Sequence, residues 1–576
     1  MTSTTRAPRA GVSTGTDVAL AALAAGIVLA AVLRLAGTLA ANLSDADPPA
    51  AGLGAGLGVL ANPQDPAAAL EAPGLQPDLY WAIAAGLLAA VAVIAVVAWR
   101  YLRPAPRPDD GFATRADVVK HASARALTKR ATNLRPSLTH PRPEDVGYRL
   151  GQCHGKDIWA SVEDSMLLVG PPRSGKGLYI VINAILDAPG AVVTTSTRPD
   201  ALTITLTARQ RRGPIAIFDP QHLAPDLPAG LRWSPVRGCE DPETAAVRAR
   251  GLASASGFGA GTENGGYWEG LTREALKHLL HAAALGERTP ADLHAWAQQP
   301  AAAADAVAIL ASAPLPHAAM WAHTLNAAIN ADPRTRDAVW SGLQLALASL
   351  SDPHVLDAVT PRPGEGFDPE SFIRNHGTLY LLATATSSGT AAPLVAALVE
   401  DLTETAKRLA AHSPGARLDP PLLLALDEIG NLAPLPSLPQ LMSEGGGSGI
   451  TVLPVLQSIS QARAAWGEQN TGTIWDAAIV KILLGGSSVT KDLHDLSTLI
   501  GDHDETTHST TIGPDGTRTS QESLRRVPIM TPQQLRTMPF GTGLVLLRSI
   551  KPLQVRLRSW TKRNDAGELI TEREAV

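Results

Sequence analysis

The sequence has little cysteine and no excess of basic charge. Cys153 and Cys239 are the only cysteines in 576 residues, too few and too far apart for a disulfide framework or a cysteine-based zinc site. The formal net charge is −5, so no global basic field favours nucleic acid, and such binding must come from local patches. A Gly-x-Ser-x-Gly nucleophile motif and a His-Glu-x-x-His zinc motif are also absent. What the chain does have is 45% hydrophobic residues over a length sufficient for several domains.

Two long apolar runs lie near the N-terminus, at about 18–43 and 81–101. Each is close to the ~20 residues that cross ~30 Å of hydrocarbon, so we interpret them as two transmembrane helices. Arg34 lies toward the outer end of the first run, where its side chain can reach the headgroups. A cleaved signal peptide is the alternative, but the second run and the lack of a clear cleavage site disfavour it.

The distribution of basic residues predicts the orientation of these helices. Arg6 and Arg9 precede the first run, residues 44–80 contain no lysine or arginine, and three arginines follow the second run. Basic flanks remain on the cytoplasmic side, so both termini are expected in the cytoplasm of a multi-pass plasma or inner membrane protein. The glycine run 52–58 in the outer loop is expected to be a flexible linker. The next segment, 104–146, is basic and rich in proline; attraction to anionic lipid is the favoured reading and DNA contact the alternative.

The strongest local signal is a glycine-bounded loop between an apolar strand and a helix. Glycines let backbone N–H groups turn toward an anion, and a helix N-terminus adds partial positive charge, so the stretch predicts a nucleotide phosphate site. The residues assigned to it are Gly170, Pro171, Pro172, Arg173, Ser174, Gly175, Lys176, Gly177 and Leu178. Lys176 would reach the outer phosphates. Gly177 stands where a Ser or Thr usually offers a hydroxyl to Mg²⁺, so the metal must take that ligand elsewhere, for example from water.

Strand and helix patterns alternate on both sides of this loop, which is typical of a parallel sheet covered by helices and indicates an α/β fold. Residues 242–360 break the alternation, because they are rich in Ala and Leu with helical spacing and contain no convincing strand. The predicted divisions are a membrane anchor at 1–103, a basic cytoplasmic connector at 104–146, a nucleotide-binding domain in two parts at 147–241 and 361–564, an inserted all-α domain at 242–360, and a loose tail at 565–576.

A second chemical signal follows the apolar strand 422–426. Asp427 and Glu428 stand at its C-terminal end, where nucleotides bind in open α/β sheets. Asp427 is suited to hold Mg²⁺, and Glu428 to orient or deprotonate an attacking water. Gln457 ends the following strand, 450–456, and is suited to sense the γ-phosphate, although a surface capping role is equally compatible with its chemistry.

Together these features resemble the type IV coupling proteins of conjugative DNA transfer, the TraG/TraD-like group. The resemblance rests on two N-terminal spans, the phosphate loop, the helical insertion, and the two motifs Asp427-Glu-x-x-Asn431-x-x-x-x-Pro436 and Gln457-Ser-x-x-Gln461. It implies a RecA-like motor domain with an all-α domain, assembled as a hexamer at the membrane, that uses ATP and Mg²⁺ to handle a DNA–relaxase substrate, expected to be single-stranded, at a type IV secretion channel. It also implies that Lys176 binds phosphate and that Gln457 is the coupling glutamine.

The sequence departs from the family pattern in one further respect. Between the acidic pair and Gln457 the family often has an arginine that reaches a neighbour's nucleotide, whereas 443–449 here reads Ser-Glu-Gly-Gly-Gly-Ser-Gly. Arg463 is one possible substitute. The leading hypothesis is a DNA-driving ATPase. The alternatives are a nucleotide-gated receptor with little turnover, which Gly177 and the missing arginine favour, and a double-stranded DNA pump of the chromosome-segregation type, which the short C-terminal region disfavours.

Overall fold

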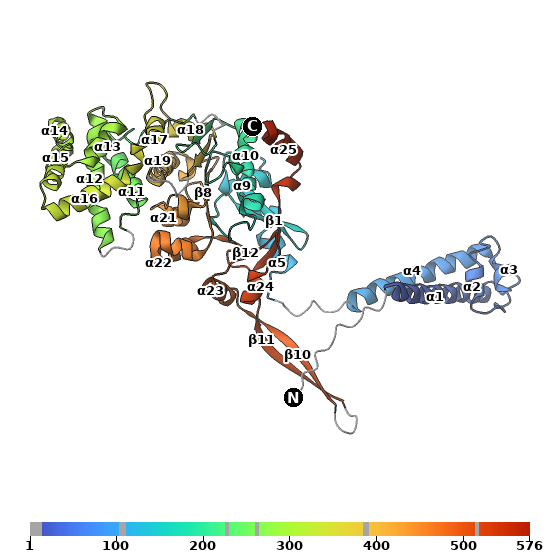
Figure 1. The fold of residues 1–576 in the computed structure, drawn as a ribbon. Coiled ribbons are helices and arrows are strands. Elements are labelled where there is room, and N and C mark those ends of the chain that lie inside the picture. The colour runs from blue at the N-terminus through green and yellow to red at the C-terminus, as the bar shows by residue number, and fades with distance from the viewer. Residues whose placement is uncertain are drawn as a thin grey trace. The chain divides into compact units, whose positions relative to one another are not determined.

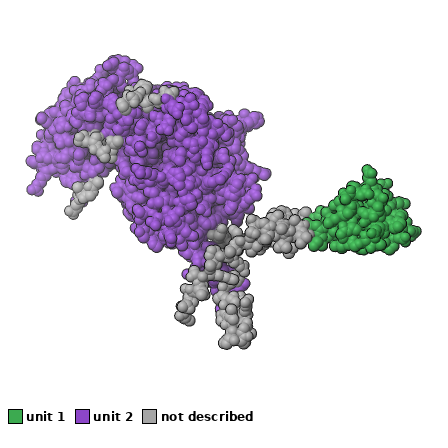
Figure 2. Space-filling model, turned by 45° about the vertical axis from the view of Figure 1, so that its right-hand side comes forward, with its two compact units in different colours: residues 1–108 green, residues 109–576 purple. Residues whose placement is uncertain are grey.

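A computed structural model describes residues 14–102, 111–224, 230–259, 264–383, 391–512 and 518–575. The chain divides into two compact units, residues 1–108 and 109–576, coloured separately in Figure 2. Two predictions lie outside the described residues: the basic positions Arg6 and Arg9 and the division at 103/104.

The first unit consists of two long apolar helices and the segment between them. Its helices are α1 (Thr14–Leu43), α2 (Ala55–Gly58), α3 (Pro66–Leu70) and α4 (Pro77–Leu102). Within α1 and α4, the stretches Ala25–Leu43 and Pro77–Ala95 are long and apolar enough to cross a membrane, by length and composition. These two helices are therefore candidate membrane anchors, as the hydropathy of the sequence predicts.

The segment between α1 and α4 differs from the flexible linker that we predicted. Gly56 lies in α2, and a Cβ at this position would meet the carbonyl oxygen of Ala30 at 2.2 Å, so glycine permits a close approach to α1. The Tyr80 hydroxyl donates to the carbonyl of Leu33 at 3.1 Å. Arg34 donates from Nε to the carbonyl of Ala51 at 2.9 Å. Glycine content suggested flexibility, but here it allows packing.

The second unit is built on an eleven-stranded mixed sheet. The strands in the unit are β1 (Gly147–Cys153), β2 (Lys156–Ser161), β3 (Met166–Val169), β4 (Val192–Ser196), β5 (Ile215–Phe218), β6 (Thr378–Leu382), β7 (Leu422–Asp427), β8 (Ile450–Leu456), β9 (Val480–Leu484), β10 (Asp502–Ile512), β11 (Arg518–Pro528), β12 (Thr542–Leu547) and β13 (Leu553–Leu557). The order in the large sheet is β2-β1-β13-β12-β9-β3-β8-β7-β4-β6-β5. All neighbours from β9 to β5 are parallel, while β12 joins β9 in the antiparallel sense.

Both faces of the parallel part are covered, because successive strand residues point to opposite faces and both sets are apolar. Leu424 and Leu426 of β7 belong to the core on the side of α11 (Pro242–Ser254) and α19 (Ala392–Ala411). Leu423 and Ala425 belong to the core on the side of α9 (Ile182–Asp187). Figure 1 shows α9 and α10 (Asp200–Gln210) on one side of β8 and α11 and α19 on the other. This layered α/β arrangement is the fold class predicted from the sequence.

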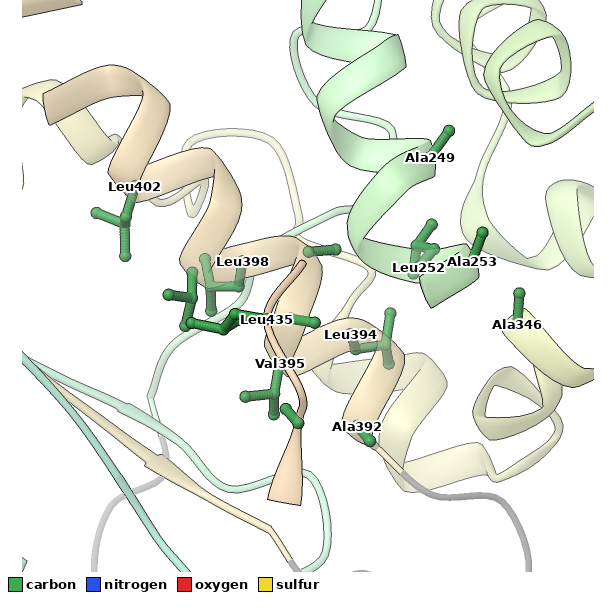
Figure 3. Packing of buried hydrophobic residues seen from close by; sticks show 14 of the residues in the cluster. Ala249, Leu252, Ala253, Ala346, Ala392, Leu394, Val395, Leu398, Leu402 and Leu435 are labelled. Carbon is green, nitrogen blue, oxygen red and sulfur yellow. The ribbon is translucent and has the colours of Figure 1, made fainter. Parts of the chain in front are cut away.

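The described part of the region between β5 and β6 contains helices, turns and loops but no strand. After α11 it contains α12 (Gly265–Leu285), α13 (Pro290–Gln298), α14 (Ala304–Ser312), α15 (Pro316–Ile329), α16 (Pro333–Ala346), η2 (Ala348–Ser351), α17 (Pro353–Ala358) and α18 (Pro369–Arg374). It joins the sheet through α11, which lies beside α19 in Figure 3. A Cβ on Gly251 would lie 2.8 Å from the Cα of Ala397, so small residues set the close approach of these helices.

The predicted connector is, from residue 111 onward, part of the second unit. It forms α5 (Arg115–His121), α6 (Ala124–Thr128), α7 (Ala131–Leu134) and α8 (Pro143–Val146). Val118, Leu127 and Leu134 are buried in the core that also contains β1 and β2. Arg135 pairs with Asp419 at 2.8 Å. The many basic residues of this segment predict a connector, whereas its few apolar residues, which are buried here, give no clear pattern in the sequence.

The remaining helices complete the layers around the sheet. They are η1 (Gly177–Val181), η3 (Pro414–Ala416), α20 (Ile429–Leu432), α21 (Leu438–Glu444), α22 (Ile459–Ala477), α23 (Thr490–Ile500), α24 (Pro532–Arg536), η4 (Trp560–Lys562) and α25 (Ala566–Ala575).

The C-terminal region contains a long hairpin and a terminal helix. Strands β10 and β11 form the hairpin and pair from Asp502 opposite Pro528 to Ile512 opposite Arg518. The loose tail predicted at 565–576 is wrong for its described part, which forms α25. Leu569 is buried there, and Arg211 of the segment after α10 forms ion pairs with Glu568 and Glu572. A helix with so few apolar residues depends on this tertiary contact rather than on its own pattern.

Candidate nucleotide-binding site

The sheet topology brings the predicted site residues to one edge. The phosphate loop follows β3, Gln457 follows β8, and Asp427 is the last residue of β7. Strands β3, β8, β7 and β4 are consecutive neighbours and parallel, so their C-terminal ends meet. The acidic pair and the loop are distant in sequence but close in the fold for this reason.

The phosphate loop is held by its own hydrogen bonds and by a glycine with positive φ. Gly170 donates from its backbone N to the carbonyl of Leu456 at 3.0 Å, and the Ser174 hydroxyl donates to the carbonyl of Pro171 at 2.7 Å. Gly175 has φ +90°, and a Cβ there would meet the ring of Tyr179 at 2.7 Å. Only glycine fits this position, because both the conformation and the space exclude a side chain.

Lys176 lies inside the loop. Its Nζ donates to the carbonyls of Gly170 at 2.8 Å and Pro171 at 3.1 Å, and the residue is 8% exposed. Burial lowers the pKa of Lys176, whereas the carboxylates of Asp427 and Glu428 favour its charged form. The ammonium group is thus kept beside the loop by main-chain acceptors that a phosphate can replace.

The acidic pair is arranged by threonines at the end of the neighbouring strand β4. The Thr195 hydroxyl donates to the main-chain oxygen of Asp427 at 2.8 Å, and the Thr197 hydroxyl donates to Oε2 of Glu428 at 2.9 Å. Glu428 has φ +52°, an uncommon conformation for a residue with a side chain and one often found at functional sites. The backbone turn directs Asp427 and Glu428 to different environments.

Asp427 fits a metal ligand. Its Oδ1 is buried without a hydrogen-bond partner among the described residues, which is unusual for a carboxylate oxygen. Burial, together with the Glu428 carboxylate, raises the pKa of Asp427 to about 6, and Lys176 acts in the opposite direction. A hard divalent cation such as Mg²⁺ would satisfy the free oxygen and favour its ionised form.

The space beside Gly177 is open. A Cβ built on this residue meets nothing within 4 Å, and its φ is not in the left-handed region. Space, then, does not exclude a serine or threonine here.

Gly177→Ser is expected to strengthen Mg²⁺ binding at the site. A hydroxyl in the open space would replace a bound water, and a charge-assisted ligand of this kind should lower the Mg²⁺ concentration for half-maximal turnover roughly tenfold. Titration of Mg²⁺ at fixed ATP measures the effect. Gly177→Ala is the matched control, since it changes the backbone in the same way without a hydroxyl. Equal half-maximal concentrations in the serine and alanine variants would contradict the assignment.

Gln457 lies half-buried between the loop and the helix that follows. Its backbone N donates to Oε1 of Gln461, which belongs to α22. The Gln461 side chain is also close to α20, since a Cβ on Gly430 would lie 3.3 Å from its Cδ. The two glutamines of the Gln457-Ser-x-x-Gln461 motif therefore connect the end of β8 with the helices after β7 and β8. The fold supplies a physical connection for a sensor at Gln457, whose role stays a prediction.

Arg463 is engaged within its own chain. Its guanidinium pairs with Asp492 at 3.0 Å and with Glu468 at 3.2 Å, and Asp492 also accepts from the backbone N of Ile459. These carboxylates would have to release Arg463 before it could reach a neighbour's nucleotide. This arrangement weighs against Arg463 as the substitute for the missing arginine.

Sequence reasoning missed two kinds of residue around the site. Thr195 and Thr197 could have been found, because polar residues at the end of a strand next to β7 are expected near the acidic pair. Phe540 could not, because no local pattern connects it with Tyr179, although the centroids of their rings are 5.3 Å apart.

The comparisons with known proteins agree with this geometry. Residues 421–540 match the TraG-D_C family, described as the TraM recognition site of TraD and TraG. No curated protein matches the chain significantly. Among solved structures, the unbound bacterial conjugative coupling protein TrwBdeltaN70 matches with a TM-score of 0.52 at 17% identity, over 76% of this chain and 91% of that one. TrwB with a non-hydrolysable ATP analogue gives a TM-score of 0.52, and TrwB with ADP and Mg²⁺ gives 0.51; both are 17% identical and cover 76% of this chain and 92% of theirs. These likenesses establish a shared fold.

Proposed function

We propose that this chain, a type IV coupling protein of the TraG/TraD-like group by its TraG-D_C segment and its fold, is a membrane-anchored ATPase that drives DNA, with an attached relaxase, into a type IV secretion channel. The observation that carries the nucleotide part is the proximity of Lys176, in the loop after β3, to Asp427 at the end of β7, with β8 between the two strands. Oδ1 of Asp427 is buried and has no hydrogen-bond partner among the described residues. Similar structures hold an ATP analogue, or ADP with Mg²⁺, which supports the same choice of ligands here.

Each residue of the site has a distinct proposed role. The loop from Gly170 to Leu178 would surround the phosphates with backbone N–H groups, and Lys176 would exchange its two carbonyl partners for phosphate oxygens. Mg²⁺ held by Asp427 would neutralise charge on the phosphate oxygens when bound. Glu428 would orient the attacking water and accept its proton, with Thr197 fixing the carboxylate.

Coupling to movement would begin at Gln457. Because Gln461 bonds the backbone of Gln457 and lies against Gly430, a change at the γ-phosphate would reach α20 and α22 together. In a hexameric ring, as the family resemblance implies, such changes would move loops that contact DNA through its phosphate backbone, independently of sequence.

The membrane anchor and the partners complete the proposal. Candidate spans in α1 and α4 would hold the ATPase at the cytoplasmic face of the plasma or inner membrane. The family described as a TraM recognition site covers residues 421–540, so this segment, with its β10–β11 hairpin, would also bind a protein of the DNA-processing complex. Leu524 on β11 is 74% exposed and would be available to such a partner.

The test is ATP turnover by the full chain in detergent, with and without single-stranded DNA. The proposal predicts turnover that single-stranded DNA stimulates. Tight ATP binding without turnover in either condition would reject the motor.

A nucleotide-gated receptor with little turnover is the second candidate. It is favoured by the ion pairs that hold Arg463 to Asp492 and Glu468, and by the glycine at position 177, since both remove groups that usually accelerate hydrolysis. In that case ATP should change the affinity for the DNA–relaxase substrate although no phosphate is released.

A further inference from the structure

Half-buried Tyr179 and exposed Phe540 form an aromatic pair beside the phosphate loop. Tyr179 lies in η1, the π-helical turn that begins at Gly177 within the loop, and Phe540 lies in the turn between α24 and β12. Their ring centroids are 5.3 Å apart and the ring planes are inclined at 65°. Such short π-helical segments occur frequently at functional sites.

Both rings lie against the loop itself. A Cβ on Gly175 would be 2.7 Å from the Tyr179 ring and 3.1 Å from Cε2 of Phe540. Gly541 has φ +82°, and a Cβ there would be 3.0 Å from the Tyr179 hydroxyl. Glycines on both sides therefore admit the rings to this position, and a side chain at either would displace them.

Phe540 is 65% exposed, and no other phenylalanine in the described part of the chain is so open to solvent. The edge contact with Tyr179 occupies at most one face of its ring. The exposed part of the residue is therefore available to a planar ligand. Burial of this exposed apolar ring under a ligand would recover the free energy that its exposure to water costs, and this favours a ligand here.

We propose that Phe540, supported by Tyr179, is the base-binding surface of the nucleotide site, where the purine stacks on the Phe540 ring. This inference rests on the proposed function, since it places the base of the nucleotide whose phosphates the loop holds. A ribose separates base from phosphates, so the base must lie just outside the loop, and Phe540 stands at that border. A phenyl ring forms no hydrogen bonds with the edge of the base and therefore does not distinguish adenine from guanine. ATP and GTP should bind with similar affinity.

The experiment compares two ligands that differ in the base. The full chain in detergent is titrated with the Mg²⁺ complexes of a non-hydrolysable ATP analogue and of inorganic tripolyphosphate. Wild type should bind the nucleotide more tightly. Phe540→Ala should weaken nucleotide binding about 5- to 150-fold, as expected for loss of one stacked base, and leave tripolyphosphate binding unchanged. Phe540→Tyr should retain nucleotide affinity. Leu345→Ala, which replaces another exposed apolar residue of the same unit, on α16, is the control and should change neither.

Each other outcome overturns the inference in a recognisable way. Equal wild-type affinity for the two ligands would reject the base-binding surface and leave the phosphate site standing. Unchanged nucleotide affinity in Phe540→Ala, with a smaller particle in light scattering, would show that the ring contacts a second copy of the chain instead. A wild type that binds neither ligand would reject both this inference and the proposed function.

Discussion

Lys176→Ala is expected to reduce ATP turnover by at least about 100-fold, the scale seen when one preorganised donor to a developing negative charge is removed. Lys176 is the buried cation of the phosphate loop, and its charge is favoured by Asp427 and Glu428. Without it, two carboxylates face the phosphates with no lysine between them. Binding of the nucleotide should weaken as well, because the lost interaction exists in the ground state. Turnover and binding are measured on the same full-chain preparation.

A lysine elsewhere on the sheet provides the matched control. Lys481 of β9 is also half-buried, donates to the carbonyl of Ala478 at 2.6 Å, and has its pKa lowered by burial. Lys481→Ala should retain turnover within a few-fold. If both alanine variants lost activity to the same extent, a general loss of folding would explain the result and the assignment of Lys176 would have no support.

Glu428→Gln is expected to lower turnover by about 10²- to 10⁴-fold while ATP remains bound. Glutamine has the same shape and can still accept the hydrogen bond that Thr197 donates to Oε2. It cannot take a proton from water at neutral pH. The variant should therefore accumulate the ATP-bound state, which is measured as retained nucleotide after gel filtration together with the rate of phosphate release.

The control for this variant is Glu444→Gln, an exposed glutamate at the end of α21. It removes the same charge from the same domain and should leave turnover unchanged. Unaltered phosphate release in Glu428→Gln would mean that another group activates the water. Loss of binding together with turnover would instead assign Glu428 to nucleotide contact.

The parts of the site that the sequence predicts are those with a local signature. Asp427 and Glu428 follow an apolar strand, and Lys176 follows a glycine loop after another strand. Each pattern places functional side chains at the end of a strand, and parallel pairing then brings the strand ends together. The α/β class and the helical insertion follow from periodicity in the same way. Confirmation of the fold therefore does not test the catalytic roles, which stay predictions.

The parts that the sequence does not predict depend on contacts between distant segments. The ion pair of Arg463 with Asp492 joins two helices, and the approach of Phe540 to Gly175 requires the whole sheet to form first. Helix α25 has too few apolar residues to be predicted from its pattern, and its position depends on contacts with α10 and the residues after it. In each case the stabilising partner is far away in the chain, so pattern and propensity carry no information about it.

The attachment of the helical insertion has an evolutionary consequence. Strand β5 forms one edge of the large sheet and pairs with β6 alone, and the insertion is the connection between these two parallel strands. Neither strand carries a residue of the proposed site. The insertion can thus be lengthened, replaced or exchanged between relatives without altering the ladder that positions Lys176 and Asp427, provided that α11 keeps Gly251 against Ala397 of α19. The helical insertion and the nucleotide site are in this sense separately heritable modules of one chain.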